Sequence, residues 1–335
     1  MRDRDREAGA LEQPGDWDRY YYGTFYWHGI PTLLGCPLAT DPNEADIALV
    51  GLPWTNNPTE RGQYLAPRMV RHRSGALHGR SHREFEVDPF SLARIRDFGD
   101  VMVLNLGNPD EGVWEIVAFY ERLDAGGCLP LTIGGDHACT YPVLRAIAGP
   151  NSRRKGPVGL IHFDSHTDTY GPYLGTVHNA GNWARLGHEE GLLDPTRVVQ
   201  IGLNGPYFPM SLDYAREAGY RLLPLTEIQS AGIPAAIAEI RRVIGDGPAY
   251  LTFDVDVLTL ADAPGVANPA AGGLTINEVF QLLCGLRGID IIGADIVCFV
   301  PQYDPSMVTA IHVSAIMHHL VTLLAETFER GRAEN

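Results

Sequence analysis

The sequence predicts a doubly wound α/β domain built around a mainly parallel sheet. Six short, nearly continuous apolar runs recur along the chain, and such runs are typical of strands that are buried on both faces. These runs are 47–51, 129–133, 158–163, 197–201, 250–253 and 291–297. Apolar residues at helical spacing occur in 111–124, 233–243, 276–286 and, at the end of the chain, 310–329. Strand and helix therefore alternate, as they do when helices cover a parallel sheet.

The 335 residues contain no internal repeat and no Pro-, Gly- or Ser-rich linker that would mark a domain boundary. We therefore expect a single domain over 41–335, preceded by an N-terminal arm over 1–40. The arm is rich in aromatic residues: Tyr20, Tyr21, Tyr22, Phe25, Tyr26 and Trp27. The sequence leaves three interpretations of this cluster open, namely packing against the main domain, a subunit contact, or a wall of the substrate site.

Charge and composition exclude several classes of protein. The net charge of −15 argues against nucleic acid as a partner, because phosphate binding needs clustered Lys and Arg. The five cysteines are scattered and never spaced as CxxC, so we expect neither a disulfide framework nor a thiolate zinc site. The N-terminus lacks the apolar stretch of a signal peptide, and we expect no run of the ~18 apolar residues that a membrane span requires. These features favour a soluble, cytoplasmic protein without a membrane partner.

Acidic and imidazole residues directly follow three of the predicted strands. The three segments are Leu131-Thr-Ile-Gly-Gly-Asp-His137, Gly159-Leu-Ile-His-Phe-Asp-Ser-His-Thr-Asp168 and Leu251-Thr-Phe-Asp-Val-Asp256. Ligands of open parallel sheets bind beyond the carboxyl ends of the strands, so polar residues at these positions indicate function. Residues two apart point to the same side of an extended chain, so the polar residues of each segment converge.

Together the three segments supply four carboxylates and two imidazoles for one centre. The candidate metal ligands are His137, Asp164, His166, Asp168, Asp254 and Asp256. Four carboxylates brought together raise each other's pKa unless cations compensate them. A single DxD is often a helix cap, and a single His is more often a hydrogen-bonded core residue; three such sites together favour metal. A set without cysteine favours Mn²⁺, Ni²⁺, Co²⁺ or Fe²⁺, and a bridged pair of ions produces hydroxide for hydrolysis.

The three segments resemble the motifs of the ureohydrolase family, which includes arginase, agmatinase and guanidinobutyrase. The family motifs GGDH, DAHxD and SxDxD correspond to Gly134-Gly-Asp-His137, Asp164-Ser-His-Thr-Asp168 and Thr252-Phe-Asp-Val-Asp256. Further similarity covers Gly51-Leu-Pro53, 62–68, 193–202, Ala263-Pro-Gly265, Gly272-Gly-Leu-Thr275 and Pro301-Gln-Tyr-Asp304. The resemblance spans nearly everything after Asp46, with the motifs in the family order.

The resemblance implies a three-layer α/β/α sandwich, assembled as a trimer or hexamer, with two divalent ions per subunit. The usual metal is Mn²⁺, and nickel-dependent members exist. One ion is then expected on His137, Asp164, Asp168 and Asp254, and the other on Asp164, His166, Asp254 and Asp256. Asp168 or Asp256 would steer a metal-bridging hydroxide onto a guanidine-type carbon. His178, in His178-Asn-Ala-Gly-Asn-Trp183, matches a family histidine that passes a proton to the departing amine.

This chain departs from the family pattern where the substrate is bound. Cys298 stands where the family has a glutamate that accepts hydrogen bonds from the guanidinium, and a thiol cannot replace that bidentate acceptor. Trp54, within 54–60, replaces a loop of small residues, and Asn179 and Trp183 alter the segment after His178. We expect these four residues to contact the substrate. The departures favour a small cationic guanidine or a biguanide, such as metformin, which would give guanylurea and dimethylamine.

Three alternatives stay open at this stage. The first is an agmatinase or guanidinobutyrase type of amidinohydrolase that produces urea. The second is a noncatalytic subunit that supports an active paralogue in a hetero-oligomer, an interpretation that Cys298 favours and the complete ligand set opposes. The third is a dinuclear hydrolase of a formimino group, which the ligand set alone does not exclude.

Overall fold

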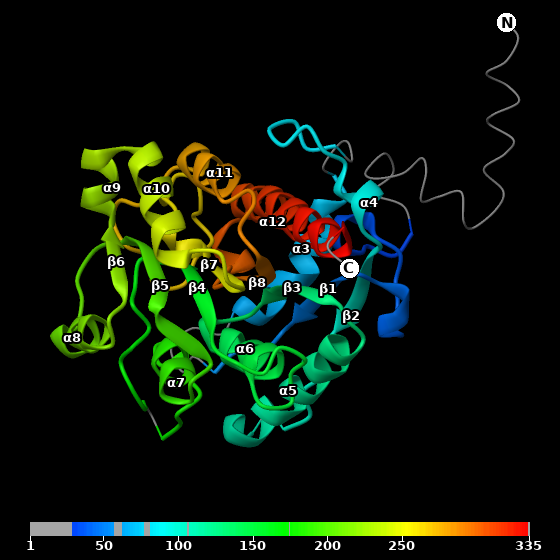
Figure 1. The fold of residues 1–335 in the computed structure, drawn as a ribbon, viewed down its shortest axis with the longest axis horizontal. Helices are drawn as coiled ribbons and strands as arrows, with labels where there is room; N and C mark the ends of the chain where they lie inside the picture. The colour runs from blue at the N-terminus through cyan, green and yellow to red at the C-terminus, as the bar shows by residue number, and fades with distance from the viewer. Residues whose placement is uncertain (1–28, 57–61, 77–80, 106, 174, 334–335) are drawn as a thin grey trace, which may run out of the picture.

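A computed structural model describes residues 29–56, 62–76, 81–105, 107–173 and 175–333 (Figure 1). Eight strands form one sheet in the order β2-β1-β3-β8-β7-β4-β5-β6, and every neighbouring pair is parallel. The strands are β1 Ile47–Leu52, β2 Ile95–Asp100, β3 Leu129–Gly134, β4 Val158–Phe163, β5 Leu193–Leu203, β6 Arg221–Pro224, β7 Ala249–Asp254 and β8 Ile291–Val297. The parallel sheet predicted from the sequence is therefore confirmed.

Helices cover both faces of the sheet. They are α3 Ala66–Ser74, α4 Pro89–Leu92, α5 Pro109–Ala125, α6 Thr140–Ala148, α7 Trp183–Glu189, α8 Pro209–Glu217, α9 Leu225–Ala231, α10 Ile233–Ile244, α11 Ile276–Gly285 and α12 Val308–Ala333. Buried side chains from α3, α10, α11 and α12 form one core cluster, and those from α5, α6, α7 and α8 form another. In Figure 1 these two groups of helices lie on opposite sides of the strands. The fold is thus the three-layer α/β/α sandwich.

The six predicted strands all lie within observed strands, whereas two observed strands were not predicted. Both of these, β2 and β6, form the edges of the sheet. β2 has the sequence Ile-Arg-Asp-Phe-Gly-Asp, and β6 has only four residues, three of them partly exposed. An edge strand does not need a continuous apolar run, because part of it faces solvent. The pattern that identified the central strands therefore missed these two.

The strand order brings the ends of four strands together. β8 and β7 lie between β3 and β4, although both follow them in sequence. The register aligns Phe163 of β4 with Phe253 of β7, and Asp254 of β7 with Val297 of β8. The polar residues that follow β3, β4 and β7, and Cys298 after β8, therefore emerge side by side at one edge of the sheet.

Helix α12 is long and apolar enough to cross a membrane by length and composition alone, which differs from the expectation that no such run exists. However, 72% of its most apolar window is buried inside the protein. It packs against α3, α4 and β8, and Leu320 and Leu324 are fully buried. It therefore occupies the position of a core helix.

The second part of the N-terminal arm is packed into the domain. Leu33, Leu34 and Cys36 are buried in the core cluster that includes α3. The backbone N–H of Leu33 donates a hydrogen bond to Asp97 at 2.8 Å. The aromatic cluster over 20–27 lies outside the described residues.

Candidate metal centre

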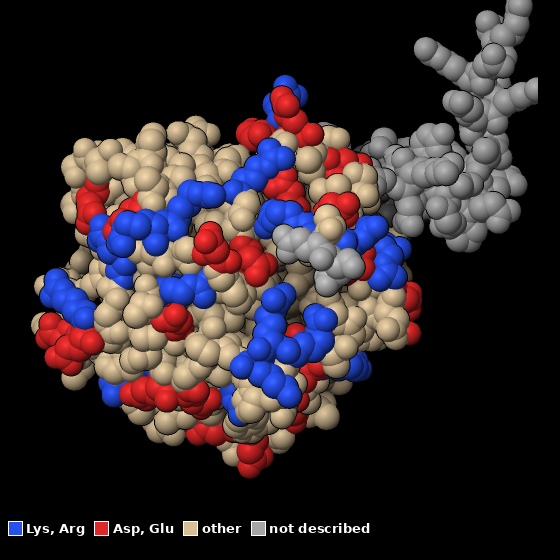
Figure 2. Space-filling view, viewed as in Figure 1, with Lys and Arg blue, Asp and Glu red and all other residues tan. Residues whose placement is uncertain are grey.

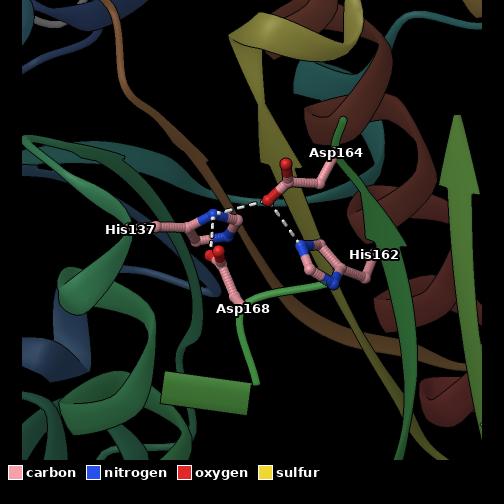
Figure 3. Close-up of side chains that lie close together, drawn as sticks. All are labelled: His137, His162, Asp164 and Asp168. Carbon is pink, nitrogen blue, oxygen red and sulfur yellow. Dashed lines mark hydrogen bonds and ion pairs between the residues drawn. The ribbon is translucent and has the colours of Figure 1, made fainter. Parts of the chain in front are cut away.

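His137 lies at the centre of three carboxylates beyond the end of β3. Its Nδ1 is 3.0 Å from an oxygen of Asp164, 2.9 Å from Asp168 and 3.2 Å from Asp254. All four side chains are buried, and within the described part of the chain Nδ1 makes no hydrogen bond of good geometry. Figure 3 shows His137, Asp164 and Asp168 pointing toward one another. One nitrogen surrounded by three buried carboxylate oxygens at about 3 Å is the donor arrangement of a cation site.

The tautomer of His137 is determined by a hydrogen bond on the side of the ring that faces away from the three carboxylates. Its Nε2 lies 2.9 Å from Oγ1 of Thr252, and this hydroxyl donates to Asp295 at 2.5 Å. Because Thr252 donates its proton to Asp295, it accepts from Nε2 of His137, which leaves the Nδ1 lone pair for a metal. Asp295 also accepts hydrogen bonds from Tyr250 and Thr140, both at 2.8 Å. Such a relay to a carboxylate is how proteins orient metal-binding histidines.

A second group of ligands shares Asp164 with the first. Nδ1 of His166 lies 3.2 Å from Oδ1 of Asp164 and 3.1 Å from Oδ2 of Asp256. The other oxygen of Asp164, Oδ2, is the one that faces His137. Asp164 therefore presents one oxygen to each group, as a bridging carboxylate does. The His166 side chain is 25% exposed, so this half of the centre faces solvent.

The charges of the centre are unbalanced without cations. Burial and the neighbouring carboxylates raise the pKa of Asp254 and of Asp256. Burial opposes ionisation of Asp164 as well, but the imidazoles of His137, His162 and His166 beside it hold its pKa well below the usual range. The same carboxylates raise the pKa of His137 and of His166 in spite of burial. The donor set therefore fits two divalent cations, which would replace the protons that the site otherwise attracts.

His162 joins the centre although the sequence analysis did not select it. Its Nε2 donates to Oδ2 of Asp164 at 2.9 Å (Figure 3). Its Nδ1 accepts from the amide of Gln200 at 2.9 Å. The side chain is fully buried within β4. The period of two that selected Asp164, His166 and Asp168 extends back to His162, so the signal was present. It was masked by the apolar run of the strand.

Trp183, predicted to contact the substrate, lies directly behind the ligands. Its indole N–H donates to Oδ2 of Asp168 at 2.6 Å, and its ring stacks on His137 with centroids 4.7 Å apart. The side chain is only 1% exposed. Asp168 has a φ of 51°, a left-handed conformation that is uncommon outside glycine. Trp183 therefore holds a strained ligand in place.

His178 lies in the loop before α7, paired with a carboxylate from a distant helix. Its Nδ1 is 2.6 Å from Oδ1 of Asp110, at the start of α5, and its carbonyl accepts a hydrogen bond from Asn56. Burial opposes ionisation of Asp110, but hydrogen bonds from His178 and Thr176 lower its pKa. Asn179 is buried, and its amide donates to the carbonyl of Thr176 at 3.2 Å. Asp110 is a further candidate that the sequence did not reveal.

Cys298 and Trp54 flank the centre from β8 and β1. Cys298 is buried with a φ of 68°, and its backbone N–H donates to the carbonyl of Gly135 at 2.7 Å. Its Sγ and one donor atom each of His137 and Asp254 all lie within 4.8 Å of one another. Trp54 is buried, and its carbonyl lies so close to Gly135 that a Cβ there would be 1.9 Å away. The thiol therefore faces the metal ligands.

Comparisons with known proteins agree with this geometry. The model of the arginase family matches residues 45–322. A guanidinopropionase of Pseudomonas aeruginosa is 41% identical over 306 residues, which cover 90% of this chain and 94% of that protein. Among solved structures, proclavaminate amidino hydrolase from Streptomyces clavuligerus matches with a TM-score of 0.83 and 30% identity, covering 90% of this chain and 99% of that one.

A formiminoglutamase of Trypanosoma cruzi, solved with Mn²⁺, matches with a TM-score of 0.77 and 25% identity, covering 89% of this chain and 99% of that one. The family match covers most of the chain, and the buried His and Asp cluster supplies metal ligands where the family motifs lie. The chain belongs to the arginase family and is a metal-binding, ureohydrolase-type hydrolase of C–N bonds in linear amidines.

Proposed function

We propose that this protein hydrolyses a C–N bond of a small guanidine-type compound at a centre of two divalent ions. The observation that supports this most strongly is the bridging position of Asp164 between the His137 and His166 groups. Mn²⁺ is the first metal to test, because the related formiminoglutamase was solved with it. Ni²⁺ is the second, because nitrogen ligands and a nearby thiol suit a softer ion.

Two ions bound there would lower the pKa of a coordinated water and so supply a nucleophile near neutral pH. The protein's own residues provide the rest. Asp168 belongs to the His137 group of ligands and Asp256 to the His166 group, and each has carboxylate oxygens that can orient that water. Nδ1 of His178 faces Asp110, which keeps the opposite nitrogen, Nε2, for exchanging a proton with the leaving amine. The Asp110 carboxylate stabilises the charged imidazolium that this exchange forms.

The proposed substrate follows from the side chain at position 298. A buried thiol accepts hydrogen bonds weakly and is not a charged partner for a guanidinium. Burial and the carboxylates of Asp254 and Asp256 also raise the pKa of the Cys298 thiol well above its usual value. We therefore place a biguanide, with metformin as the example, or a small guanidine ahead of alkylguanidines. Metformin would take up one water and yield guanylurea and dimethylamine.

The second candidate is a guanidino acid or agmatine, cleaved to give urea. It is favoured by the 41% identity to a guanidinopropionase, a level at which relatives often share a substrate class. Metformin would give guanylurea, whereas agmatine, a guanidino acid or free guanidine would give urea, so the product distinguishes a biguanide from the other substrates. A formimino substrate would give formamide instead.

One assay discriminates among these candidates. The purified chain is stripped of metal, reloaded with Mn²⁺ or Ni²⁺, and given metformin, guanidine, agmatine, 3-guanidinopropionate and 4-guanidinobutyrate. Guanylurea and dimethylamine from metformin, or urea from guanidine, are the expected products. Turnover of agmatine or of the guanidino acids alone would refute the ranking. The Asp164→Asn variant is the control that has to be inactive with every substrate.

The assembly and location of the protein are also proposals. We propose a trimer or hexamer in the cytoplasm, formed by this chain alone or with a paralogous subunit. Mass measurement of the assembled protein in solution tests the stoichiometry. If a paralogue is present and Asp164→Asn leaves the activity of the complex unchanged, this chain is the supporting subunit.

A further inference from the structure

A second cluster of metal-binding side chains lies away from the centre described above. His82 and Glu84 belong to the loop before α4. His319 belongs to α12, which comes much later in the chain and covers one face of the sheet (Figure 1). One donor atom from each of the three residues lies within 4.8 Å of the other two. Nδ1 of His82 is 3.0 Å from an oxygen of Glu84. The three side chains therefore converge on one point.

One ring nitrogen of His319 has a lone pair that accepts no hydrogen bond from the described residues. Its Nδ1 lies 2.9 Å from the carbonyl of Ala315, one helical turn earlier, and a carbonyl only accepts, so Nδ1 carries the proton. Nε2 is therefore the unprotonated nitrogen, and it is buried without a hydrogen-bond partner among the residues that the structure describes. Histidines that bind metals donate their other ring N–H to a carbonyl in this way. A buried acceptor without a partner is otherwise unfavourable.

His82 has the same property. The residue is 5% exposed, and its Nδ1 is buried without a hydrogen bond of good geometry to any described residue, in spite of its proximity to Glu84. The surrounding rings keep both imidazoles in position. Phe280 stacks on His319 with centroids 4.3 Å apart, and Phe85 meets the edge of His82 at 4.7 Å. The ring of His318 stacks on His82 at 5.0 Å.

The protonation state also favours a metal. Burial and the neighbouring imidazoles lower the pKa of His82 to about 3. Burial is the main cause that lowers the pKa of His319 to about 4, although the Glu84 carboxylate opposes the change. Both imidazoles are therefore neutral at pH 7, the form that binds metals. Glu84 is 52% exposed and supplies both a negative charge and a path from solvent.

We propose that His82, Glu84 and His319 form a second metal site, which binds one divalent ion of the zinc class. Two imidazoles and one carboxylate are a donor set that Zn²⁺ accepts, with a water in the fourth position. Ligand bonds of about 2.0–2.2 Å require these donor atoms to approach one another by only small side-chain rotations. The bound ion would join the 81–87 loop to α12 and thereby stabilise the folded chain.

The full chain is stripped with chelator and dialysed against Zn²⁺, and bound zinc is measured by mass spectrometry. We expect three zinc ions per chain in the wild type, two in the His137 and His166 groups and one here. In Glu84→Gln, whose side chain is half exposed, we expect the affinity for the third ion to fall at least about tenfold. His319→Phe retains a ring against Phe280 and loses the third ion. Exposed His72 on α3 provides the control, His72→Ala, which binds all three.

The Asp164→Asn variant separates this site from the hydrolytic centre. We expect it to bind fewer ions overall and still to gain thermal stability from Zn²⁺, a gain that Glu84→Gln in the same background abolishes. Two bound ions in the wild type would overturn the proposal. A third ion that persists in both Glu84→Gln and His319→Phe would overturn it too. Should His319→Phe fail to fold, Glu84→Gln decides, because its exposed side chain contributes little to packing.

Discussion

Replacing Trp183 by phenylalanine tests whether this residue positions a metal ligand or contacts the substrate. The change removes the indole N–H that donates to Asp168 at 2.6 Å and keeps an aromatic ring beside His137. A hydrogen bond to a charged group contributes roughly 1.5–3 kcal/mol, and one to a metal ligand affects metal affinity about 10- to 100-fold. Asp168 has a left-handed backbone, so it depends on this contact more than an unstrained ligand would.

We therefore expect Trp183→Phe to weaken binding of one ion about 10- to 100-fold, while KM at saturating metal stays within about twofold. Titration calorimetry with Mn²⁺, followed by kinetics at high metal concentration, measures the two quantities separately. Trp114→Phe is the matched control, because that indole is 48% exposed on α5. A large rise in KM with unchanged metal affinity would refute the positioning role and restore substrate contact.

Three further changes have defined outcomes. Cys298→Glu restores a carboxylate acceptor, and we expect it to shift the ratio of kcat/KM toward agmatine and guanidinobutyrate; an unchanged substrate profile would mean that other residues determine the pocket. Removing metal with chelator leaves the negative charges of the buried carboxylates uncompensated, so the temperature at the midpoint of thermal unfolding should fall and then recover when Mn²⁺ is added. Equal midpoints with and without metal would contradict the cation requirement. Hydrogen bonds from Arg242 and Arg221 lower the pKa of Glu239 to about 2. The unfolded chain binds this proton first, so Glu239 stabilises the fold above about pH 4.5 and loses that effect toward pH 2. In Glu239→Gln, the free energy of unfolding measured with urea should therefore change less between these two pH values than in the wild type, by a difference of under about 1 kcal/mol. An equal pH dependence in the two proteins would disprove the assignment.

The central strands and the cluster of His and Asp side chains that follows them could be predicted because both leave local signals in the sequence. A strand buried on both faces needs a continuous apolar run, and a ligand pair such as Asp254 and Asp256 repeats at a period of two. The edge strands β2 and β6 lack the first signal because they are only half covered. Their positions follow from pairing with β1 and β5, which no local pattern encodes.

The roles of the residues that orient the ligands are harder to predict, because these residues act across the sheet. His162 continues the period of two that selected Asp164, but its partner is on another strand. His162 faces Gln200 as its partner in the β4–β5 register, and Thr252 faces Asp295 in the β7–β8 register. Each looks like an ordinary polar residue inside an apolar strand. Only the strand order and register show that one member of each pair contacts a metal ligand, His162 contacting Asp164 and Thr252 contacting His137. Asp110 is similar, since its partner His178 lies 68 residues away.

Cys298 belongs both to the position where the substrate is expected to bind and to the surroundings of the metal centre. In the sequence, Cys298 stands out only because a thiol cannot accept the hydrogen bonds that a glutamate accepts from a guanidinium. In the structure its Sγ lies within 4.8 Å of donor atoms of His137 and Asp254, so it also changes the surroundings of the metal. Its left-handed φ of 68° fixes the direction of the side chain toward these ligands. A thiol favours softer ions than a carboxylate does. We therefore expect Cys298 both to weaken binding of an alkylguanidinium and to shift metal preference from Mn²⁺ toward Ni²⁺, so that substrate and metal preference change together.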